Sequence, residues 1–387
     1  MNIDFIFNVI LVIIFGSIGI LGNILLIRLF MNTDTKVNFH KLMITLAIYD
    51  SIYIIFSFVA FALPELSEDY IKYGFHHYIA TKAVPLLQVT LTGSVYCTVS
   101  VSLERYMTVC HPFLVAEKKW SAKWHIIPII VFSIIYNAPH FFEFRTTYGP
   151  VKNATSTLKS NHSFMNIGLN NQTEDASMIT LNNTIISDFV PNLETLAQNI
   201  TRNLSLKDFD KEEKFEYQVE LTELRKNKFY YTIYIIGLNL VFNGVIPFTT
   251  IVISNILLHN RLKEITAGSP YQSVSDSLIN KYRNVNEIKF NEIVLAKISI
   301  IISAVFLIFH SVKWIPNIYE LIQRIQCDED DIPWPNWIET ITTISHFLII
   351  LNSSVNYYIY AFTHNKVPRP KRWNLNIINM DTIEMYT

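Results

Sequence analysis

Seven stretches of the chain carry almost no charge, and they predict its architecture. They lie at 6–27, 43–64, 84–103, 126–142, 229–258, 298–319 and 340–362. Of the 156 residues in them, only Asp50 and Lys313 are charged, whereas the other 61 charges fall in the remaining 231 residues. A bilayer core needs about 20 apolar residues of helix, which the short fourth stretch reaches with its flanking residues.

None of these stretches alternates strictly between apolar and polar positions, as strands of a membrane barrel would. Helices are therefore the expected spanning structure, because lipid offers the backbone no hydrogen-bond partners. We predict an all-α integral membrane protein with a seven-transmembrane helix domain over 1–372. Its helices are expected at about 5–30, 41–64, 77–110, 124–144, 227–259, 290–323 and 338–362.

Composition excludes several other classes of protein. Half of the residues are hydrophobic, and 16% are charged, against about 25% in an ordinary soluble domain. A soluble enzyme or a disordered protein is therefore excluded, and no span carries a nucleophile–base or metal-binding motif that would support an enzyme. The net charge of -1 gives no support for a nucleic-acid partner.

Lysine and arginine in the short loops predict the orientation. The loops after spans one, three and five, together with the tail, hold 17 of them, and the loops after spans two and six hold three. Because positive charge stays on the cytoplasmic side, we expect the N-terminus outside and a short tail, 363–387, in the cytoplasm. The chain is predicted to be a multi-pass protein of the plasma membrane.

The long segment 146–226 is predicted to be an extracellular loop. It is polar and low in complexity, so we expect it to be disordered in its middle, with 211–228 extending the fifth helix outward. Its Asn-x-Ser/Thr sequons predict glycosylation, although single sequons arise by chance. The sequons are at Asn153, Asn161, Asn171, Asn182, Asn199 and Asn203.

The three cysteines are too widely separated to pair. Cys97 lies inside the third span, Cys110 at its cytoplasmic end and Cys327 outside. We predict no intrachain disulfide, which leaves packing roles or dimerisation through Cys327.

Asp50 in the second span is a functional candidate because a charge inside a membrane is costly. Other spans offer polar groups at similar depth: Asn23, Ser94, Asn352, Ser353 and Asn356. A carboxylate among hydroxyl and amide oxygens suits a sodium ion at Asp50 and Ser94. The alternative is a hydrogen-bond network that only joins helices. No other cofactor is expected.

The third span ends at its cytoplasmic edge with Glu104-Arg105-Tyr106. A bare Glu–Arg pair at an interface is usually solvated and contributes little. An ion pair from Arg105 to Glu292 would instead join the third and sixth helices, and its rupture would be a switch.

These features resemble a rhodopsin-like (class A) G-protein-coupled receptor over about 1–145 and 229–372. The resemblance rests on Gly22-Asn23, Leu46-x-x-x-Asp50 and Glu104-Arg105-Tyr106. Further strings are similar to invertebrate FMRFamide-type neuropeptide receptors: Tyr136-Asn137-Ala138-Pro139, Phe306-Leu307-Ile308-Phe309-His310 and Asn352-Ser353-Ser354-Val355-Asn356-Tyr357-Tyr358-Ile359-Tyr360.

The resemblance implies roles for particular residues. Arg105 would be the switch that engages a heterotrimeric G protein, restrained by Glu104 and Glu292, with Tyr106 beside it. Tyr360 would be the switch tyrosine of span seven and Pro247 the bend of span five. His310, with Phe306, would replace the aromatic toggle of span six.

One departure from the family concerns a disulfide. The family usually pairs a cysteine at the start of span three with one in the following extracellular loop. Here the first position falls near Ala80, and 146–226 has no cysteine.

The ligand is expected to be an extracellular peptide. Span three carries Leu87 where amine receptors carry an aspartate, which argues against a monoamine. An Arg-Phe-amide end would need a carboxylate, for which Glu143, Glu320 and Glu339 are open alternatives. The predicted ligand pocket comprises Gln88, Glu143, Tyr231, Lys313, Asn317 and Glu320.

The predicted function is therefore signalling by an FMRFamide-like neuropeptide through outward movement of helix six. The alternative is an orphan or ligand-independent seven-helix relative, and a transporter or channel is the remote alternative, since no internal repeat is visible.

Overall fold

The computed structural model describes residues 5–32, 38–66, 75–118, 121–150, 215–266, 285–326 and 335–366. Within these residues, seven helical segments are long and apolar enough to cross a membrane, which confirms the predicted all-α seven-helix class. Each helix satisfies its own backbone hydrogen bonds, as a membrane interior requires. The candidate spans are Ile6–Asn32, Asn38–Leu66, Thr81–Cys110, Lys123–Phe142, Lys228–Ile265, Asn291–Gln323 and Asn336–His364.

Most spans combine more than one helical element. Span one is η1 (Ile6–Leu11) and α2 (Val12–Asn32), and span two is α3 (Asn38–Ser57), η2 (Phe58–Ala62) and α4 (Leu63–Leu66). The later elements are α6 (Phe75–Cys110), α7 (Pro112–Lys118), α8 (Lys123–Asn137), η3 (Ala138–Phe142), α10 (Glu223–Lys226), α11 (Lys228–Tyr230), η5 (Tyr231–Leu238), η6 (Leu240–Val245), α12 (Ile246–Thr266), α14 (Val285–Ser311), α15 (Trp314–Gln326) and α16 (Asn336–Lys366).

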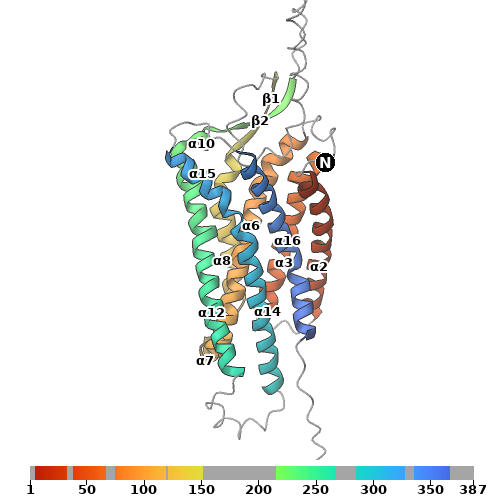
Figure 1. Cartoon of the computed structure of the whole chain (residues 1–387), viewed down its shortest axis with the longest axis vertical. Helices are drawn as coiled ribbons and strands as arrows, with labels where there is room; N and C mark the ends of the chain where they lie inside the picture. The colour runs from red at the N-terminus through yellow and green to blue at the C-terminus, as the bar shows by residue number, and fades with distance from the viewer. Residues whose placement is uncertain are drawn as a thin grey trace, which may run out of the picture.

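The helices lie side by side as an elongated bundle (Figure 1), and α6 packs against four of them, α3, α8, α12 and α14. Figure 1 shows the two strands and the start of the first span at one end, with α7 at the other. We call these the outer and inner ends, following the predicted orientation. Span five changes from wide π-helical turns to an α-helix at Ile246, next to Pro247, which lacks the N–H that a continuing helix would use.

A cluster of fully buried side chains holds the helices together toward the inner end. It joins α2, α3, α6, α14 and α16 through residues such as Phe30, Phe39, Leu42 and Ile298. Phe30 lies edge-on to Tyr360, with 4.9 Å between ring centroids. Cys97 belongs to this cluster, and Cys97 and Cys110 are free thiols, whereas Cys327 lies outside the described residues.

The sixth span is interrupted, which differs from the continuous helix expected at 290–323. α14 ends at Ser311 and α15 begins at Trp314. Pro316 has no N–H to donate to the carbonyl of Val312, four residues earlier. That carbonyl instead accepts a hydrogen bond from the N–H of Ile315 at 3.2 Å, so the chain turns at Val312 and Lys313.

The expectation for the long loop was wrong at its C-terminal end. β1 (Phe144–Pro150) pairs antiparallel with β2 (Phe215–Leu221), with Phe144 opposite Leu221. The helix expected over 211–228 is therefore a strand followed by the short α10 and α11. The apolar residues Phe215, Tyr217, Val219 and Leu221 alternate with polar ones, which is the period of a strand.

Spans two and three approach closely at a glycine, and this contact yields a stability prediction. A Cβ atom at Gly93 would lie 2.2 Å from Cε1 of Tyr49. Gly93→Ala should therefore lower the free energy of unfolding by about 1–3 kcal/mol, the usual cost of overpacking. The measurement is the midpoint of thermal unfolding in detergent.

The Tyr49→Ala background is the control, because it removes the ring that the new methyl group would meet. An equal loss of stability with and without the ring would contradict this account of the contact.

Candidate functional site

The inner end contains a buried arginine bound by two carboxylates. The side chain of Arg105 in α6 is 1% exposed, and its Nη2 donates to Glu104 Oε1 at 2.7 Å. Its Nη1 donates to Glu292 Oε2 in α14 at 2.6 Å, so the ion pair expected from the sequence is present. The guanidinium also lies over the ring of Phe39, 4.8 Å from its centroid. Thus α3, α6 and α14 all contact one charge.

The other two residues assigned to this switch lie beside the cluster. Tyr106 turns away from Arg105, and its hydroxyl is 3.0 Å from Nε2 of His111. Tyr360 is buried in α16, packs on Phe30 and stacks on His364. Within the described part of the chain, neither side chain bonds to the Arg105 guanidinium, so their switch roles remain predictions.

Asp50 forms the centre of a polar network in the middle of the bundle. It is fully buried, and it accepts hydrogen bonds from Ser94 Oγ at 2.7 Å and from Asn356 Nδ2 at 2.8 Å. Asn23 joins less directly, since its Nδ2 donates to the carbonyl of Ser353 at 3.2 Å. Asn352 is buried in the same helix as Asn356 but makes no hydrogen bond to Asp50 within the described residues.

The two residues assigned to the toggle stack on each other. The rings of Phe306 and His310 in α14 have centroids 4.2 Å apart, and both side chains are buried. Phe248 of α12 packs against Phe306 at 5.8 Å. His310 lies one residue before the end of α14, so the stack is next to the interruption of span six.

A narrow cavity of about 50 Å³ lies at the outer end. Residues from spans three to six line it, and they include five of the six residues predicted for the ligand pocket: Gln88, Glu143, Tyr231, Asn317 and Glu320. Tyr231 donates a hydrogen bond from its hydroxyl to Glu320. The structure thus brings five of the six predicted pocket residues together around one cavity. The small volume of this cavity was not predicted from the sequence.

Lys313 does not line this cavity, so its assignment to the pocket needs correction. It lies in the turn between α14 and α15, one helical turn inward of Asn317, and its Nζ is 5.9 Å from the ring of Trp314. Within the described residues it makes no ion pair, and the nearby carboxylate of Glu320 accepts a hydrogen bond from Tyr231.

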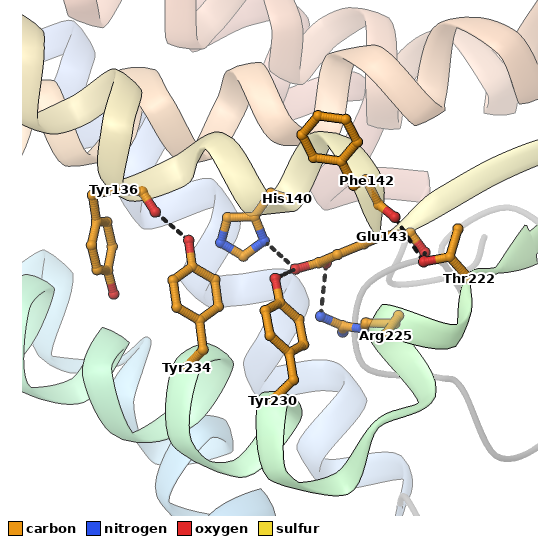
Figure 2. A network of polar contacts seen from close by, with 8 residues as sticks. All are labelled: Tyr136, His140, Phe142, Glu143, Thr222, Arg225, Tyr230 and Tyr234. Atoms are coloured by element: carbon orange, nitrogen blue, oxygen red, sulfur yellow. Dashed lines mark hydrogen bonds and ion pairs between the residues drawn. The ribbon is translucent and has the colours of Figure 1, made fainter.

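Glu143 is the most heavily bonded residue of the cavity wall (Figure 2). It is 1% exposed, and its Oε1 lies 2.7 Å from Nδ1 of His140 and 2.8 Å from the hydroxyl of Tyr230. Its Oε2 accepts from Nη1 of Arg225 at 3.0 Å. The backbone of Thr222 also donates to the Glu143 carbonyl at 3.0 Å. These contacts join the end of span four to the start of span five.

The pKa of Glu143 reflects these contacts. Burial by itself raises the pKa of this carboxyl, but the hydrogen bond with His140 and the positive charge of Arg225 outweigh burial. The net effect is a pKa below the ordinary value of 4.5. Glu143 is therefore an ionised carboxylate at neutral pH.

Sequence reasoning missed three of the partners of Glu143. His140 could have been found, because its i,i+3 spacing from Glu143 places them on one side of a helical turn. Arg225 and Tyr230 lie more than 80 residues along the chain, and no local pattern links them to Glu143. The six predicted glycosylation sites lie outside the described residues.

Comparisons with known proteins agree with this arrangement. Residues 5–173 match the family model of the serpentine-type seven-transmembrane G-protein-coupled-receptor chemoreceptors, Srv. The chain is 26% identical to the FMRFamide receptor of Drosophila melanogaster over 93% of its own length and 52% of that receptor. It is 31% identical to the FMRFamide peptide receptor frpr-18 of Caenorhabditis elegans over 33% of its own length and 31% of that protein.

The fold and these matches define a multi-pass protein of the plasma membrane that is similar to G-protein-coupled receptors rather than to enzymes. The curated relatives that it matches are FMRFamide receptors, which agrees with the rhodopsin-like, FMRFamide-type resemblance of its sequence. The chain spans about half the length of the first of these relatives and about a third of the second.

The Glu143 contacts predict how stability depends on pH. The pKa of Glu143 is lower in the folded protein than in the unfolded chain. The ionised carboxylate therefore contributes to the free energy of unfolding above about pH 4.5, and this contribution is lost as the pH falls through the folded-state pKa. The thermal midpoint of the wild type should exceed that of Glu143→Gln at pH 5.5, and this difference should shrink below pH 4.5.

Glu220→Gln, in the adjoining hairpin, is the matched control. Its ion pair with Arg145 is at 2.9 Å but largely exposed, so its loss should change stability little. A Glu143→Gln midpoint equal to the wild type at pH 5.5 would refute the prediction.

Proposed function

We propose that this protein is a receptor for an extracellular FMRFamide-like neuropeptide and that it activates a heterotrimeric G protein. The proposal is supported by the two relatives, both of which are named for FMRFamide peptides. It is also supported by the charge of the outer cavity, which is lined by the carboxylates of Glu143 and Glu320 and by one guanidinium, that of Arg225. An excess of negative charge favours a basic peptide.

The proposal that the protein activates a G protein rests on the buried side chain of Arg105. Its contact with Glu292 is the one that crosses from α6 to α14, and the side chain of Glu292 is 30% exposed at the inner end. If the inner end of α14 swings outward, Glu292 leaves and Arg105 becomes available to a partner. Peptide binding outside would shift the population toward that open state.

The outer cavity must open before a peptide can enter. Sites for small ligands typically enclose about 300–1,000 Å³, whereas this cavity encloses about 50 Å³. α15 lines it and packs against η5 and η6 of span five, where Trp314 lies on Gly244. Movement of α15 away from span five would enlarge the cavity and displace the outer end of the interrupted sixth span.

The narrow cavity also favours a second candidate, a receptor relative that signals without a bound peptide. The lack of cysteine in 146–226 points the same way, because the usual disulfide of the family cannot form there. A screen of amidated peptides against cells that express the chain, read by calcium and cyclic AMP, separates the two candidates.

Substitution of Arg105 tests the proposed mechanism. Arg105→Ala should abolish signalling evoked by Phe-Met-Arg-Phe-amide, because the G-protein contact is lost, while surface expression and peptide binding persist. Radioligand binding and a G-protein activation assay on the same membranes measure both quantities.

Arg261→Ala is the control for loss of positive charge at the inner end. Arg261 is half exposed in α12 and pairs with Glu264 at 2.7 Å, so this variant should keep most of the signal. Unchanged signalling in Arg105→Ala would refute the mechanism.

We further propose that Asp50 and Ser94 hold an allosteric sodium ion. Asp50 is fully buried and has no cationic partner within the described residues, and the Ser94 hydroxyl oxygen lies 2.7 Å from its carboxylate. A carboxylate and a hydroxyl oxygen match the hard oxygen ligands that such a cation prefers, and the ion would balance the buried charge.

Sodium should therefore raise the thermal midpoint of the wild type more than an equal concentration of potassium does. Asp50→Asn should abolish this difference, and Ser133→Ala, which removes a buried hydroxyl outside the network, should preserve it. A full sodium response in Asp50→Asn would exclude the site.

A further inference from the structure

The side chain of Arg225 occupies a site that has the chemistry of an arginine-binding subsite. Its Nη1 donates to Glu143 at 3.0 Å, and its guanidinium carbon lies 4.6 Å from the ring centroid of Tyr231 and 5.7 Å from that of Phe144. A carboxylate beside aromatic faces is an arrangement that favours a planar guanidinium over an ammonium group. Glu143 is held in place by His140 and Tyr230, as Figure 2 shows.

This subsite forms part of the wall of the outer cavity. Glu143, Phe144, Arg225 and Tyr231 all line the cavity, so a guanidinium that entered from outside would meet the same carboxylate and the same rings. The subsite is thus located where a ligand would bind rather than deep in the packed bundle. It is already filled by a residue of the chain itself.

Arg225 is carried by a segment that could withdraw. It lies in α10, a helix of four residues that packs on β2 and on α11, the first turn of span five. Its neighbours Leu224 and Lys226 are exposed, whereas the side chain of Arg225 is 10% exposed and points inward to Glu143. The arginine could leave through a local movement of its side chain and of this short helix, which lies outside the candidate spans.

We infer that Arg225 is an internal competitor that occupies the subsite for an arginine side chain of the peptide ligand. Binding would exchange one guanidinium for another on Glu143, so the buried carboxylate would remain paired throughout. A lysine side chain would gain less, because it lacks the planar group that stacks on Tyr231. This inference rests on the proposed peptide ligand for its biological meaning, but the subsite itself can be tested without that ligand.

The first experiment uses a small probe in place of the peptide. Purified Arg225→Ala receptor should be stabilised against heat by N-acetyl-arginine amide, and half of the effect should occur at a concentration about tenfold lower than in the wild type. Such a factor is expected if Arg225 fills the subsite about 90% of the time. N-acetyl-citrulline amide, which is neutral, should stabilise neither protein, and Arg225→Ala with Glu143→Gln should lose the response to arginine.

The second experiment uses Phe-Met-Arg-Phe-amide itself. Its affinity for Arg225→Ala in membranes should rise by about tenfold on the same reasoning, and the peptide with citrulline in place of arginine should show no gain. Arg225→Lys keeps a positive charge and guards against misfolding of the alanine variant. It should also bind the arginine probe more tightly than the wild type, because lysine competes less well for the subsite.

The outcomes separate this inference from the proposed function. If the small probe stabilises Arg225→Ala and Arg225→Lys but Phe-Met-Arg-Phe-amide binds no variant, the subsite stands and the proposed ligand class falls. If the peptide activates the wild type but neither variant gains affinity for either probe, Arg225 only joins the two spans and the inference is overturned.

Discussion

One buried charge constrains the whole inner end of this protein. Arg105 is 1% exposed, and a guanidinium in such a place must remain paired, because an uncompensated buried charge costs several kcal/mol. Glu104 supplies a partner from the same helix, and Glu292 supplies one from α14. The position of α14 therefore depends on the Arg105 ion pair, and α14 can move away from α6 only when the contact with Glu292 is broken or weakened. The Arg105–Glu292 ion pair is therefore suited to act as a switch between two positions of α14 rather than as a fixed structural contact.

The outer end also depends on a buried charged group that must remain paired, but here the group is a carboxylate instead of a guanidinium. Glu143 is a buried carboxylate that joins the end of span four to Arg225 and Tyr230 at the start of span five. Its contacts and the β1–β2 hairpin close the base of the long loop, where related receptors usually have a disulfide. Between the two ends, the turn at Val312 and Lys313 divides span six, so that α15 can follow the outer cavity while α14 carries Glu292.

The sequence predicted those features whose signal is local or strongly periodic. Long apolar runs predicted the seven helices, and the lone Asp50 predicted a buried polar network, since neither depends on distant partners. The ion pair from Arg105 to Glu292 was predicted because the two residues lie at the same membrane edge. The structure shows where this approach fails. The hairpin was missed although β2 alternates, because the Glu and Lys residues around it have a high intrinsic helix propensity.

The partners of Glu143 could not have been predicted from the sequence. Arg225 is separated from it by 82 residues and reaches it only through the fold. The small size of the cavity was equally inaccessible, because it depends on how Trp314 packs on Gly244 and on how α15 lies against span five. Pro316 was visible in the sequence before the structure showed the break at α15. In many spans, however, a proline bends the helix without interrupting it. Whether span six bends or breaks at Pro316 depends on tertiary contacts.

The central claim is that the Arg105–Glu292 ion pair holds the inner end of α14 against α6. The most direct measurement is the distance between spin labels at Phe113 in α7 and Asn291 in α14, both of which are exposed, in the wild type and in Glu292→Gln. The account predicts that the substitution alone, without ligand, increases the population at longer distance. An unchanged distance distribution in a correctly folded Glu292→Gln receptor would contradict it.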